Sequence, residues 1–381
     1  MSTTLDGQPT VNRSTAEEFA QRLLDAILGA QFVQAACLGD RLGYYRALAE
    51  GGPLTPPELA AATGTGERYT REWLEHQAVV GVLTVDDPGA APEERRFELP
   101  AGPAESLTDT ASPAHVLPMA RMVGGIGKRL DALVEAYRSG GGVGWAEFGE
   151  DAREGQGGAN RPLFLGALPR QYLPSIPDVA AVLDGGRIAV VGCGVGWSSI
   201  GIALAHPSVT VDGYDVDAPS IEVARANAAE AGVADRVHFS TADIAGLAGR
   251  YDLVTAFECV HDMPDPVSVL AAMRSLAEPD GVVLVMDENV AETFTAPGDD
   301  VEQLMYGWSI TCCLPDGLST PGSVGTGTVM RPDALRRYAT EAGFATVDVL
   351  PVKDDFFRFY RLRPPSGIRT ADPDDVSRVG R

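Results

Sequence analysis

Three glycines that alternate with other residues stand directly after a short apolar stretch. Gly192, Gly194 and Gly196 follow the expected strand Arg187–Val191 and precede an expected helix over Trp197–Ala205. Glycines at a strand-to-helix turn let the backbone approach a ligand closely, and the free N–H groups of the helix point at that ligand. A dinucleotide-binding loop would carry its third glycine where this chain has a tryptophan, so the loop alone is also consistent with a tight structural turn.

Acidic residues close the next three expected strands. The strands span 209–214, 237–240 and 251–256, and the acidic residues at or after their ends are Asp215, Asp243 and Glu258. Ligands of open parallel sheets bind outside the carboxyl ends of the strands, where these side chains would meet. A carboxylate after the second strand can accept hydrogen bonds from both hydroxyls of a ribose. One such residue could be a solvated strand end, but three of them behind a glycine loop predict a ligand site.

A histidine and an aspartate follow the fourth expected strand. His261 and Asp262 stand in the segment CVHDMPDP (259–266). Histidine titrates near neutral pH, and a nearby carboxylate can fix its tautomer. The pair predicts a general base with an orienting partner, and a packed structural histidine is the alternative.

The charge of the chain argues against several classes of partner. Its net charge is −23 at pH 7, and such a surface repels nucleic-acid phosphates and anionic lipid. No stretch approaches 18 uninterrupted apolar residues, and the N-terminus lacks a basic segment followed by an apolar one, so we expect neither a membrane span nor secretion. The five cysteines are scattered without a CxxC pair, which favours a reduced cytoplasm.

The elements that must position these residues begin with a mainly helical domain over residues 1–105. Its first helix is expected to start at a capping box of Ser14 and Glu17. A helix-turn-helix over 57–80 and a hairpin over 83–99 then follow in the order of a winged helix. Residues 1–120 carry eight arginines and no lysine against 17 acidic residues, so we expect this domain to dimerise rather than to bind DNA.

The rest of the chain is expected to divide into a connector, an α/β domain and a tail. The connector, 106–180, has an expected helix over 114–138 and an acidic, glycine-rich stretch over 145–158 that is expected to be a loop. Over 181–363, apolar strands alternate with amphipathic helices, which is typical of a parallel α/β sheet. Residues 364–381 have no apolar period and are expected to be disordered.

Taken together, these motifs resemble the class I S-adenosylmethionine-dependent methyltransferases. The matching segments are VVGCGVGWSS, the aspartate after the second strand, TADI, YDLVTAFE and LAEPDGVVLVMDE. The resemblance implies a Rossmann-like sheet of seven strands, closed by an antiparallel pair over 345–352 and 355–362. It also implies that S-adenosylmethionine is the cofactor, with its methionine portion near the three glycines. The other residues of the implied cofactor site are Asp215 at the ribose, Val216 directly after it, Asp243 and Ile244 at the adenine, and Phe257 and Glu258 after the fourth strand.

The N-terminal domain narrows the resemblance to small-molecule methyltransferases that dimerise through a winged helix and roof the substrate with it. In the O-methyltransferases among them, an HDW motif supplies the catalytic base, which implies that role for His261 with Asp262 beside it. Met263 replaces the tryptophan of that motif. The expected reaction is methyl transfer to a small organic acceptor in secondary metabolism.

A second resemblance, to bacterial α-keto acid C-methyltransferases, keeps a metal-assisted reaction open. There the same pair would be two metal ligands, and a later segment resembling TCCLPDG (311–317) would supply a histidine as the third. This chain has Cys312 at that place. Cysteine can ligate zinc or iron as a thiolate, but we favour the metal-free base because the histidine is absent.

The acceptor itself is not defined by the sequence. Glu288 after the fifth strand, and Tyr306 and Trp308 in the insertion that follows it, are candidate substrate contacts. A winged-helix regulator that senses a small molecule is the alternative from a different functional class, and the acidic charge argues against it.

Overall fold

The structure is a computed structural model that describes residues 15–247 and 249–365. The chain divides into two compact units, residues 1–108 and residues 109–381, and each is described by itself. The domain boundary predicted at 105 thus falls near the end of the first unit, and most of the predicted connector belongs to the second. The expected cap at Ser14 and nearly all of the expected disordered tail lie outside the described residues.

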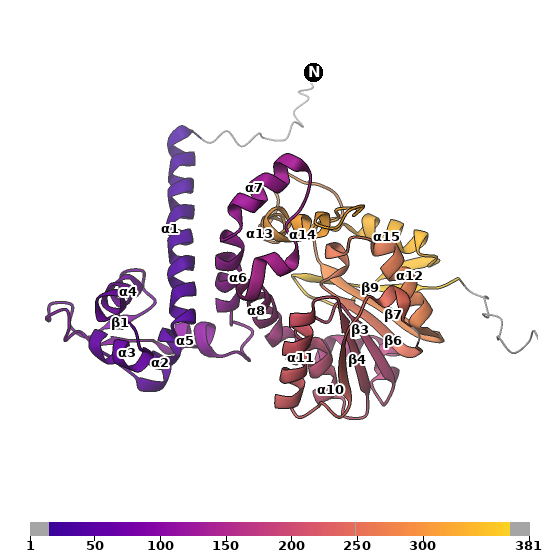
Figure 1. The fold of residues 1–381 in the computed structure, drawn as a ribbon, viewed down its shortest axis with the longest axis horizontal. Coiled ribbons are helices and arrows are strands. Elements are labelled where there is room, and N and C mark those ends of the chain that lie inside the picture. Colours follow the sequence, from indigo (N-terminus) through magenta and orange to yellow (C-terminus); the bar gives the residue numbers. More distant parts are fainter. Residues whose placement is uncertain (1–14, 248, 366–381) are drawn as a thin grey trace, which may run out of the picture. The chain divides into compact units, whose positions relative to one another are not determined.

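The first unit is the mainly helical winged-helix domain that the sequence predicts (Figure 1). Its elements are α1 (Ala16–Arg41), α2 (Tyr44–Gly51), α3 (Pro56–Thr63), α4 (Glu67–Val79), the antiparallel pair of β1 (Thr84–Val85) and β2 (Phe97–Glu98), and α5 (Ala101–Thr108). Thr15 and Glu18 form a capping box at the start of α1. The indole N–H of Trp73 donates to the carbonyl oxygen of Ala35 at 2.9 Å, which ties α4 to α1.

Helix α1 exposes a wide apolar surface. Phe19, Leu23 and Ile27 are each about half exposed, at 51%, 52% and 48%. Among the described helices, α1 alone is long and apolar enough to cross a membrane by length and composition, and 11% of its most apolar window is buried. An amphipathic helix gains most of its stability by burying its apolar face, so this surface calls for a covering partner.

A seven-stranded sheet organises the second unit and confirms the predicted fold class. Its strands are β3 (Arg187–Val191), β4 (Thr210–Asp215), β5 (Val237–Thr241), β6 (Tyr251–Phe257), β7 (Ala277–Glu288), β8 (Thr346–Val349) and β9 (Phe357–Arg363). They lie in the order β5-β4-β3-β6-β7-β9-β8. Strands β3 to β7 pair in parallel, and β9 pairs antiparallel to β7 and β8, which confirms the predicted closing hairpin. The chain changes direction across the sheet between β3 and β6, and ligands of such sheets bind at that switch point.

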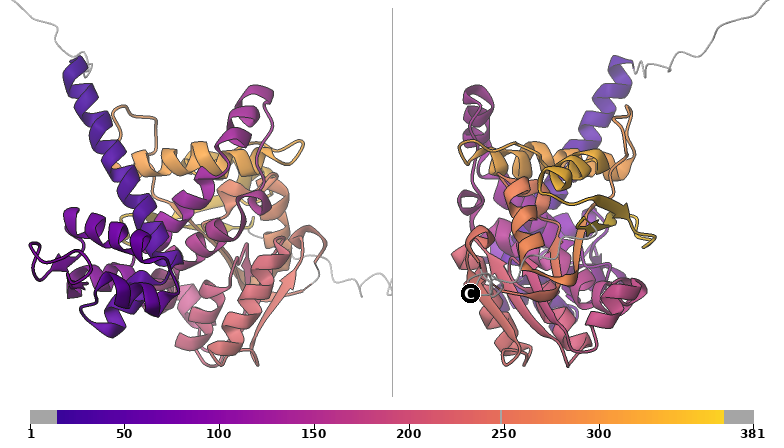
Figure 2. Two further views of the ribbon diagram at one scale, coloured as in Figure 1. Left: turned by 60° about the vertical axis from the view of Figure 1, so that its left-hand side comes forward. Right: turned by 90° about the vertical axis from the view of Figure 1, so that its right-hand side faces the viewer.

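Helices cover both faces of the sheet (Figures 1 and 2). One face carries α9 (Pro177–Val182), α10 (Trp197–Ala205) and α11 (Ala218–Glu230), and the other carries α12 (Pro266–Leu276) and α15 (Pro332–Glu341). Side chains of β3 alternate between the two layers, with Ile188 and Val190 in one core and Ala189 and Val191 in the other. A strand buried on both faces has to be apolar throughout. For this reason the apolar residues directly before the glycine loop predict a strand.

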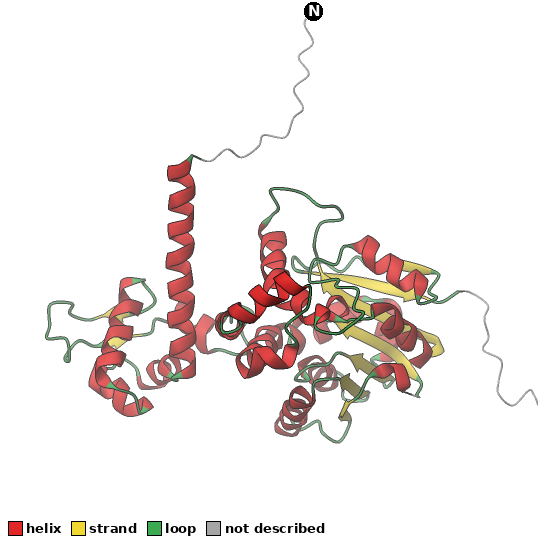
Figure 3. Ribbon diagram, turned by 45° about the horizontal axis from the view of Figure 1, so that its top comes forward, coloured by secondary structure: helices red, strands yellow, loops and turns green. Residues whose placement is uncertain are grey.

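The remaining long helices of the second unit come from two segments far apart in the sequence. Figure 3 shows the strands of the sheet in yellow with helices in red beside them. The first segment holds α6 (Leu117–Gly127), α7 (Leu130–Ser139), α8 (Trp145–Leu165) and the short turns η1 (Leu168–Tyr172) and η2 (Leu173–Ser175). The second follows β7 and holds α13 (Asp300–Trp308), the π-helical turn η5 (Ser309–Cys313) and α14 (Leu314–Leu318). The backbone N–H of Val143 donates to the carbonyl oxygen of Pro315 at 3.0 Å, which joins the two segments.

Two sequence predictions for the first of these segments are wrong. The single helix expected over 114–138 is two helices, α6 and α7, and the loop expected over 145–158 lies within α8. Gly149, with a φ angle of 78°, marks a kink inside α8, whereas three later glycines of this stretch, Gly155, Gly157 and Gly158, mark close packing. A Cβ atom on Gly155 would lie 2.8 Å from the backbone nitrogen of Met122, and one on Gly157 would lie 2.4 Å from Cγ2 of Val195. A local glycine pattern does not distinguish a flexible loop from a helix that needs close neighbours.

Candidate functional site

The glycine loop has the backbone conformation that its residues suggested. Gly192, Gly194 and Gly196 have φ angles of 64°, 52° and 87°, a region that other residues adopt at a cost. The backbone N–H of Gly194 donates to Oδ2 of Asp215 at 2.8 Å, and the N–H of Asp217 donates to Oδ1 at 2.9 Å. Asp215 therefore fixes the loop to the end of β4, and its remaining lone pairs are available to a ligand.

The other predicted residues of the cofactor site lie at the ends of β4, β5 and β6. Val216 is 74% exposed beside Asp215, and Ile244 is buried among the apolar residues of one sheet layer. Asp243 accepts the backbone N–H of Ala245 at 3.0 Å and so caps the turn η3 (Ile244–Gly246). Phe257 is buried with its ring centre 6.2 Å from that of Phe164.

Glu258 is held by two amides that sequence reasoning missed. Nδ2 of Asn160 donates to Oε2 of Glu258 at 2.6 Å, and Nε2 of Gln156 lies 3.3 Å from the same oxygen. Both amides come from α8, about 100 residues earlier in the chain. Burial raises the pKa of Glu258 to about 7, although the hydrogen bond from Asn160 acts in the opposite direction. No local signal could have found these partners, because Gln156 and Asn160 lie about 100 residues from Glu258 in the sequence.

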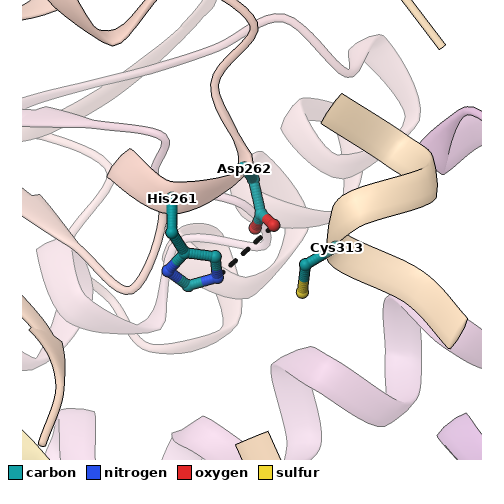
Figure 4. Close-up of side chains that lie close together, drawn as sticks. All are labelled: His261, Asp262 and Cys313. Carbon is teal, nitrogen blue, oxygen red and sulfur yellow. Dashed lines mark ion pairs between the residues drawn. The ribbon is translucent and has the colours of Figure 1, made fainter. Parts of the chain in front are cut away.

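His261 lies among three carboxyl groups at the end of β6, and Figure 4 shows one of them, that of Asp262. His261 occupies the turn η4 (Val260–Asp262) and is 3% exposed. Its Nδ1 is 2.8 Å from Oδ1 of Asp287 and 3.0 Å from Oε2 of Glu288, both at the end of β7. Its Nε2 is 3.3 Å from Oδ1 of Asp262. The sequence predicted Asp262 as the partner, but the shortest contact is with Asp287, which the sequence did not single out.

The surrounding carboxylates determine the charge of this histidine. Burial alone would lower the pKa of His261, but Asp262, Glu288 and Asp287 outweigh it and raise that pKa well above 6.5. Burial also opposes ionisation of Asp287, yet the attraction of His261 holds the pKa of that carboxyl below its usual value. The pKa of Glu288 is instead raised well above its usual value, chiefly by burial. The carboxyl groups therefore make the imidazole of His261 a stronger base and stabilise its protonated form, while burial favours the protonated form of Glu288.

The cysteine that reaches His261 is Cys313, not the predicted Cys312 (Figure 4). The ligating atoms of His261, Asp262 and Cys313 all lie within 4.8 Å of one another. Cys312 is 2% exposed in an apolar cluster with residues of α6, α7 and α8, such as Met122 and Phe148. The sequence could not separate two adjacent cysteines, because the turn η5 decides which one points to the histidine.

These donors would suit a cation in two overlapping sets. One is His261 with Asp262 and Cys313, and the other is His261 with Asp287 and Glu288. A nitrogen, a carboxylate and a sulfur ligand together suit zinc or iron. A hydrogen bond with Cys312 and burial raise the pKa of the Cys313 thiol well above its usual value, so a metal bound there would have to displace its proton.

The predicted substrate contacts fall in different surroundings. Glu288 lies against His261, as described above. The hydroxyl of Tyr306 is 3.4 Å from a guanidinium nitrogen of Arg331 and the ring is partly exposed. Trp308 lines an apolar hollow of about 210 Å³ together with residues of α6 and α7, such as Ile126 and Leu133.

Helix α8 contacts several residues at the edge of the sheet where the candidate site lies. Nε of Arg153 donates to Oδ2 of Asp217 at 2.8 Å, and both side chains are largely buried. The guanidinium of Arg161 lies 4.5 Å from the ring centre of Trp197, the first residue of α10. At the start of α8, the N–H of Trp145 donates to Oδ1 of Asp316 at 2.7 Å. Residues of α8 therefore contact the glycine loop, the end of β4 and Glu258.

Comparison with known proteins yields two family matches. Residues 184–317 match a methyltransferase domain, and residues 30–109 match the Rv2258c-like winged HTH domain. Among curated proteins, the chain is 34% identical over 175 residues to a ubiquinone biosynthesis O-methyltransferase of Aromatoleum aromaticum, covering 45% of this chain and 70% of that protein. It is 38% identical over 123 residues to the protein of the same name from Bordetella bronchiseptica, covering 31% of this chain and 49% of the relative. The chain thus spans about half the length of the Bordetella relatives that it matches.

Solved structures share the fold over nearly the whole chain. The structure of mitomycin 7-O-methyltransferase superposes with a TM-score of 0.68 at 24% identity, covering 92% of this chain and 99% of that one. Human N-acetylserotonin methyltransferase, solved with S-adenosylmethionine, gives a TM-score of 0.65 at 20% identity, covering 93% of this chain and 100% of that one. At these identities the likeness establishes the common architecture of both units.

Proposed function

Because the chain belongs to the S-adenosylmethionine-dependent methyltransferases, we propose that it methylates a hydroxyl oxygen of a small organic acceptor, with His261 as the general base. One observation carries the proposal: His261 is buried at the switch point of the sheet, and Asp287 holds its Nδ1 at 2.8 Å. The O-methyltransferase names of the relatives support oxygen as the methylated atom. We place the reaction in secondary metabolism and in the cytoplasm, where the thiols of the chain would stay reduced.

The residues present fit the proposed cofactor. Three glycines in the left-handed region open the backbone at the end of β3, and an oxygen of Glu258 is buried there without a partner. The positive sulfonium of S-adenosylmethionine supplies the reactive methyl group, so the protein mainly positions the acceptor and removes its proton. We propose that Asp215 receives the ribose, that Val216, Asp243 and Ile244 receive the adenine side, and that Gly192, Gly194 and Gly196 adjoin the methionine portion.

The contacts of His261 explain how it would take a proton. With Nδ1–H donated to Asp287, the lone pair lies on Nε2, and that nitrogen can accept the hydroxyl proton as the oxygen gains the methyl group. Asp262, 3.3 Å from Nε2, would then stabilise the imidazolium that forms. Glu288 lies against Nδ1, on the other side of the His261 ring. Tyr306 and Trp308 remain proposed contacts of the acceptor.

The test of this function separates cofactor binding from transfer. We expect His261→Gln to reduce methyl transfer by about 10²–10⁴-fold, the usual contribution of a general base. S-adenosylhomocysteine should still bind that variant, as measured by calorimetry. The assay would offer phenols and other hydroxylated compounds with a labelled methyl donor. His238→Gln, on the exposed side of β5, is the matched control and should leave transfer unchanged. Full transfer by His261→Gln would refute the base assignment.

A metal-assisted C-methylation of an α-keto acid is a second candidate, because Cys313 joins His261 and Asp262 within 4.8 Å. A bound zinc or iron would polarise the keto acid and stabilise the enolate. We would measure metal per chain by elemental mass spectrometry in wild type, His261→Ala, Cys313→Ala and the adjacent control Cys312→Ala. This candidate requires near-stoichiometric metal that is lost with His261→Ala and Cys313→Ala but kept by Cys312→Ala. Metal-free wild type that binds S-adenosylhomocysteine would exclude it.

We also propose that the chain forms a homodimer through its N-terminal domain. The exposed apolar surface of α1 supports this, because a second copy would cover it. The match of residues 30–109 to a winged HTH domain supports the presence of the domain that we expect to dimerise. The acidic balance of the chain, with 53 acidic against 30 basic residues, argues against nucleic acid and anionic membranes as partners.

A further inference from the structure

We propose that the carboxylate of Glu258 recognises the α-ammonium group of the methyl donor's amino-acid portion. The inference rests on the proposed methyltransferase function and assigns one side chain to one chemical group of the cofactor. Three features of the structure support it: an unusual backbone conformation, a half-satisfied buried carboxylate and the contacts of the adjoining turn of α8.

The backbone of Glu258 adopts the left-handed conformation, which is unusual for a residue other than glycine. Among the described residues it is the one non-glycine residue with a positive φ angle, 53°. Such a conformation is strained for a residue other than glycine and persists only where the surroundings impose it. The N–H of Glu258 donates to the carbonyl oxygen of Met286 at 2.8 Å, which holds the residue at the end of β6. The side chain is thereby directed inward, under α8, where its partners Gln156 and Asn160 lie.

Only one oxygen of the Glu258 carboxylate accepts hydrogen bonds from the protein. Asn160 and Gln156 both approach Oε2, at 2.6 Å and 3.3 Å. Oε1 is buried and has no hydrogen-bond partner in the protein. A buried acceptor without a donor destabilises the protein, and more so when it is charged. The site therefore lacks a donor, and a cation would also offset the burial that raises the pKa of this group.

The position of Glu258 favours an amino acid's ammonium as that donor. The turn of α8 that carries Gln156 and Asn160 also packs Gly157 against Val195 of the glycine loop. Helix α10 begins directly after that loop, and the free N–H groups at a helix start favour a carboxylate. An ammonium lies one carbon from the carboxylate of an amino acid, so the two groups would be received side by side. Asp215 is proposed to receive the ribose, and each of its oxygens already accepts a backbone N–H group, whereas Oε1 of Glu258 has no hydrogen-bond partner.

The experiment compares two ligands that differ only in this group. Calorimetry on the full chain would use S-adenosylhomocysteine and its deaminated analogue, in which hydrogen replaces the α-amino group. Wild type should prefer the amino ligand by about 10–100-fold, the range expected for a hydrogen bond between charged groups. Glu258→Gln should lose most of that preference by binding S-adenosylhomocysteine more weakly, with the affinity for the analogue nearly unchanged. Glu302→Gln, the same change in a buried glutamate of α13 outside the proposed cofactor site, should keep the preference.

Several outcomes would overturn the proposal. Wild type without a preference would do so directly, whether or not any variant folds. Glu258→Gln that keeps the preference, or that loses both ligands equally, would show a structural role only. If Glu258→Gln does not fold, Glu258→Asp should show a reduced preference, because its shorter side chain places the carboxylate farther from the ammonium group of the ligand. Wild type that binds neither ligand would refute the proposed function as well, which distinguishes that failure from the failure of this inference.

Discussion

At the scale of single residues, the candidate site joins one histidine to three carboxyl groups that differ in state. Asp287 stays ionised beside His261, whereas burial favours the protonated form of Glu288. Asp262 contacts the opposite ring nitrogen. Groups whose surroundings push their pKa values apart are typical of sites that move protons. The carboxylates make the imidazole a stronger base and also stabilise its protonated form.

This arrangement predicts how methyl transfer depends on pH. Only neutral imidazole accepts a proton, and the pKa of His261 is raised well above 6.5. Transfer should therefore rise with pH through a midpoint above that value. Asp287→Asn removes one of the charges that raise this pKa, so the midpoint should move to lower pH and the maximal rate should fall. The measurement is kcat/KM against pH. Asp348→Asn, the same change on exposed β8, should leave the profile unchanged, and an unshifted midpoint in Asp287→Asn would contradict the assignment.

At the scale of elements, α8 depends on glycine for close packing rather than for flexibility. Where α8 meets α10, a Cβ atom on Gly201 would lie 1.9 Å from the carbonyl oxygen of Phe164. The same helix holds Glu258 through Asn160 and holds Asp217 through Arg153. Any change that forces α8 away from α10 should therefore also disturb the cofactor site.

Substitution of Gly201 tests this dependence. Gly201→Ala should destabilise the protein by about 1–3 kcal/mol, the usual cost of overpacking, because the clash is with backbone atoms that cannot rotate away. It should also weaken binding of S-adenosylhomocysteine. Gly307→Ala in α13 is the matched control. No atom lies within 4 Å of its added Cβ, so it should be neutral or stabilise by about 0.5–1 kcal/mol. The measurements are urea unfolding and calorimetry, and equal stability of the two variants would contradict the packing argument.

At the scale of the whole molecule, two compact units carry different tasks. The second unit contains the proposed cofactor and acceptor residues, whereas the first exposes the apolar surface of α1. Beyond about 250 residues, chains usually divide into domains with separate cores. In the proposed dimer, a second copy of the chain would cover the apolar surface of α1 that is otherwise exposed to water.

The dimer can be tested through the charge of α1. Leu24 and Ile27 are each 48% exposed, and changing both to glutamate should convert the dimer to a monomer, as measured by light scattering after gel filtration. Arg22→Glu changes the net charge by the same amount, and the helical repeat places it on the other side of α1. That control should remain dimeric. Monomeric wild type would refute the proposal, and a protein that binds lipid vesicles through α1 would assign this surface to a membrane instead.

The sequence by itself determined the strands of the sheet, the glycine loop and the carboxylates that follow the strands. Local rules are sufficient there, because a strand buried on both faces must be apolar and a left-handed turn favours glycine. Those rules predicted the strands on either side of the glycine loop and brought His261 and Glu258 to one edge, whereas the count of seven strands and the closing hairpin came from the resemblance to the methyltransferases.

Only the tertiary structure decided which side chains meet at that edge. Asn160 joins Glu258 and Asp287 joins His261 across long stretches of chain, and Cys313 reaches the histidine in place of Cys312. Residues 145–158 resemble a loop in sequence, because Gly155 and Gly157 pack against neighbours that the local pattern does not contain. The physical reason is the same in each case: hydrogen bonding and close packing depend on distances in space, and residues far apart in the sequence carry no local mark of them.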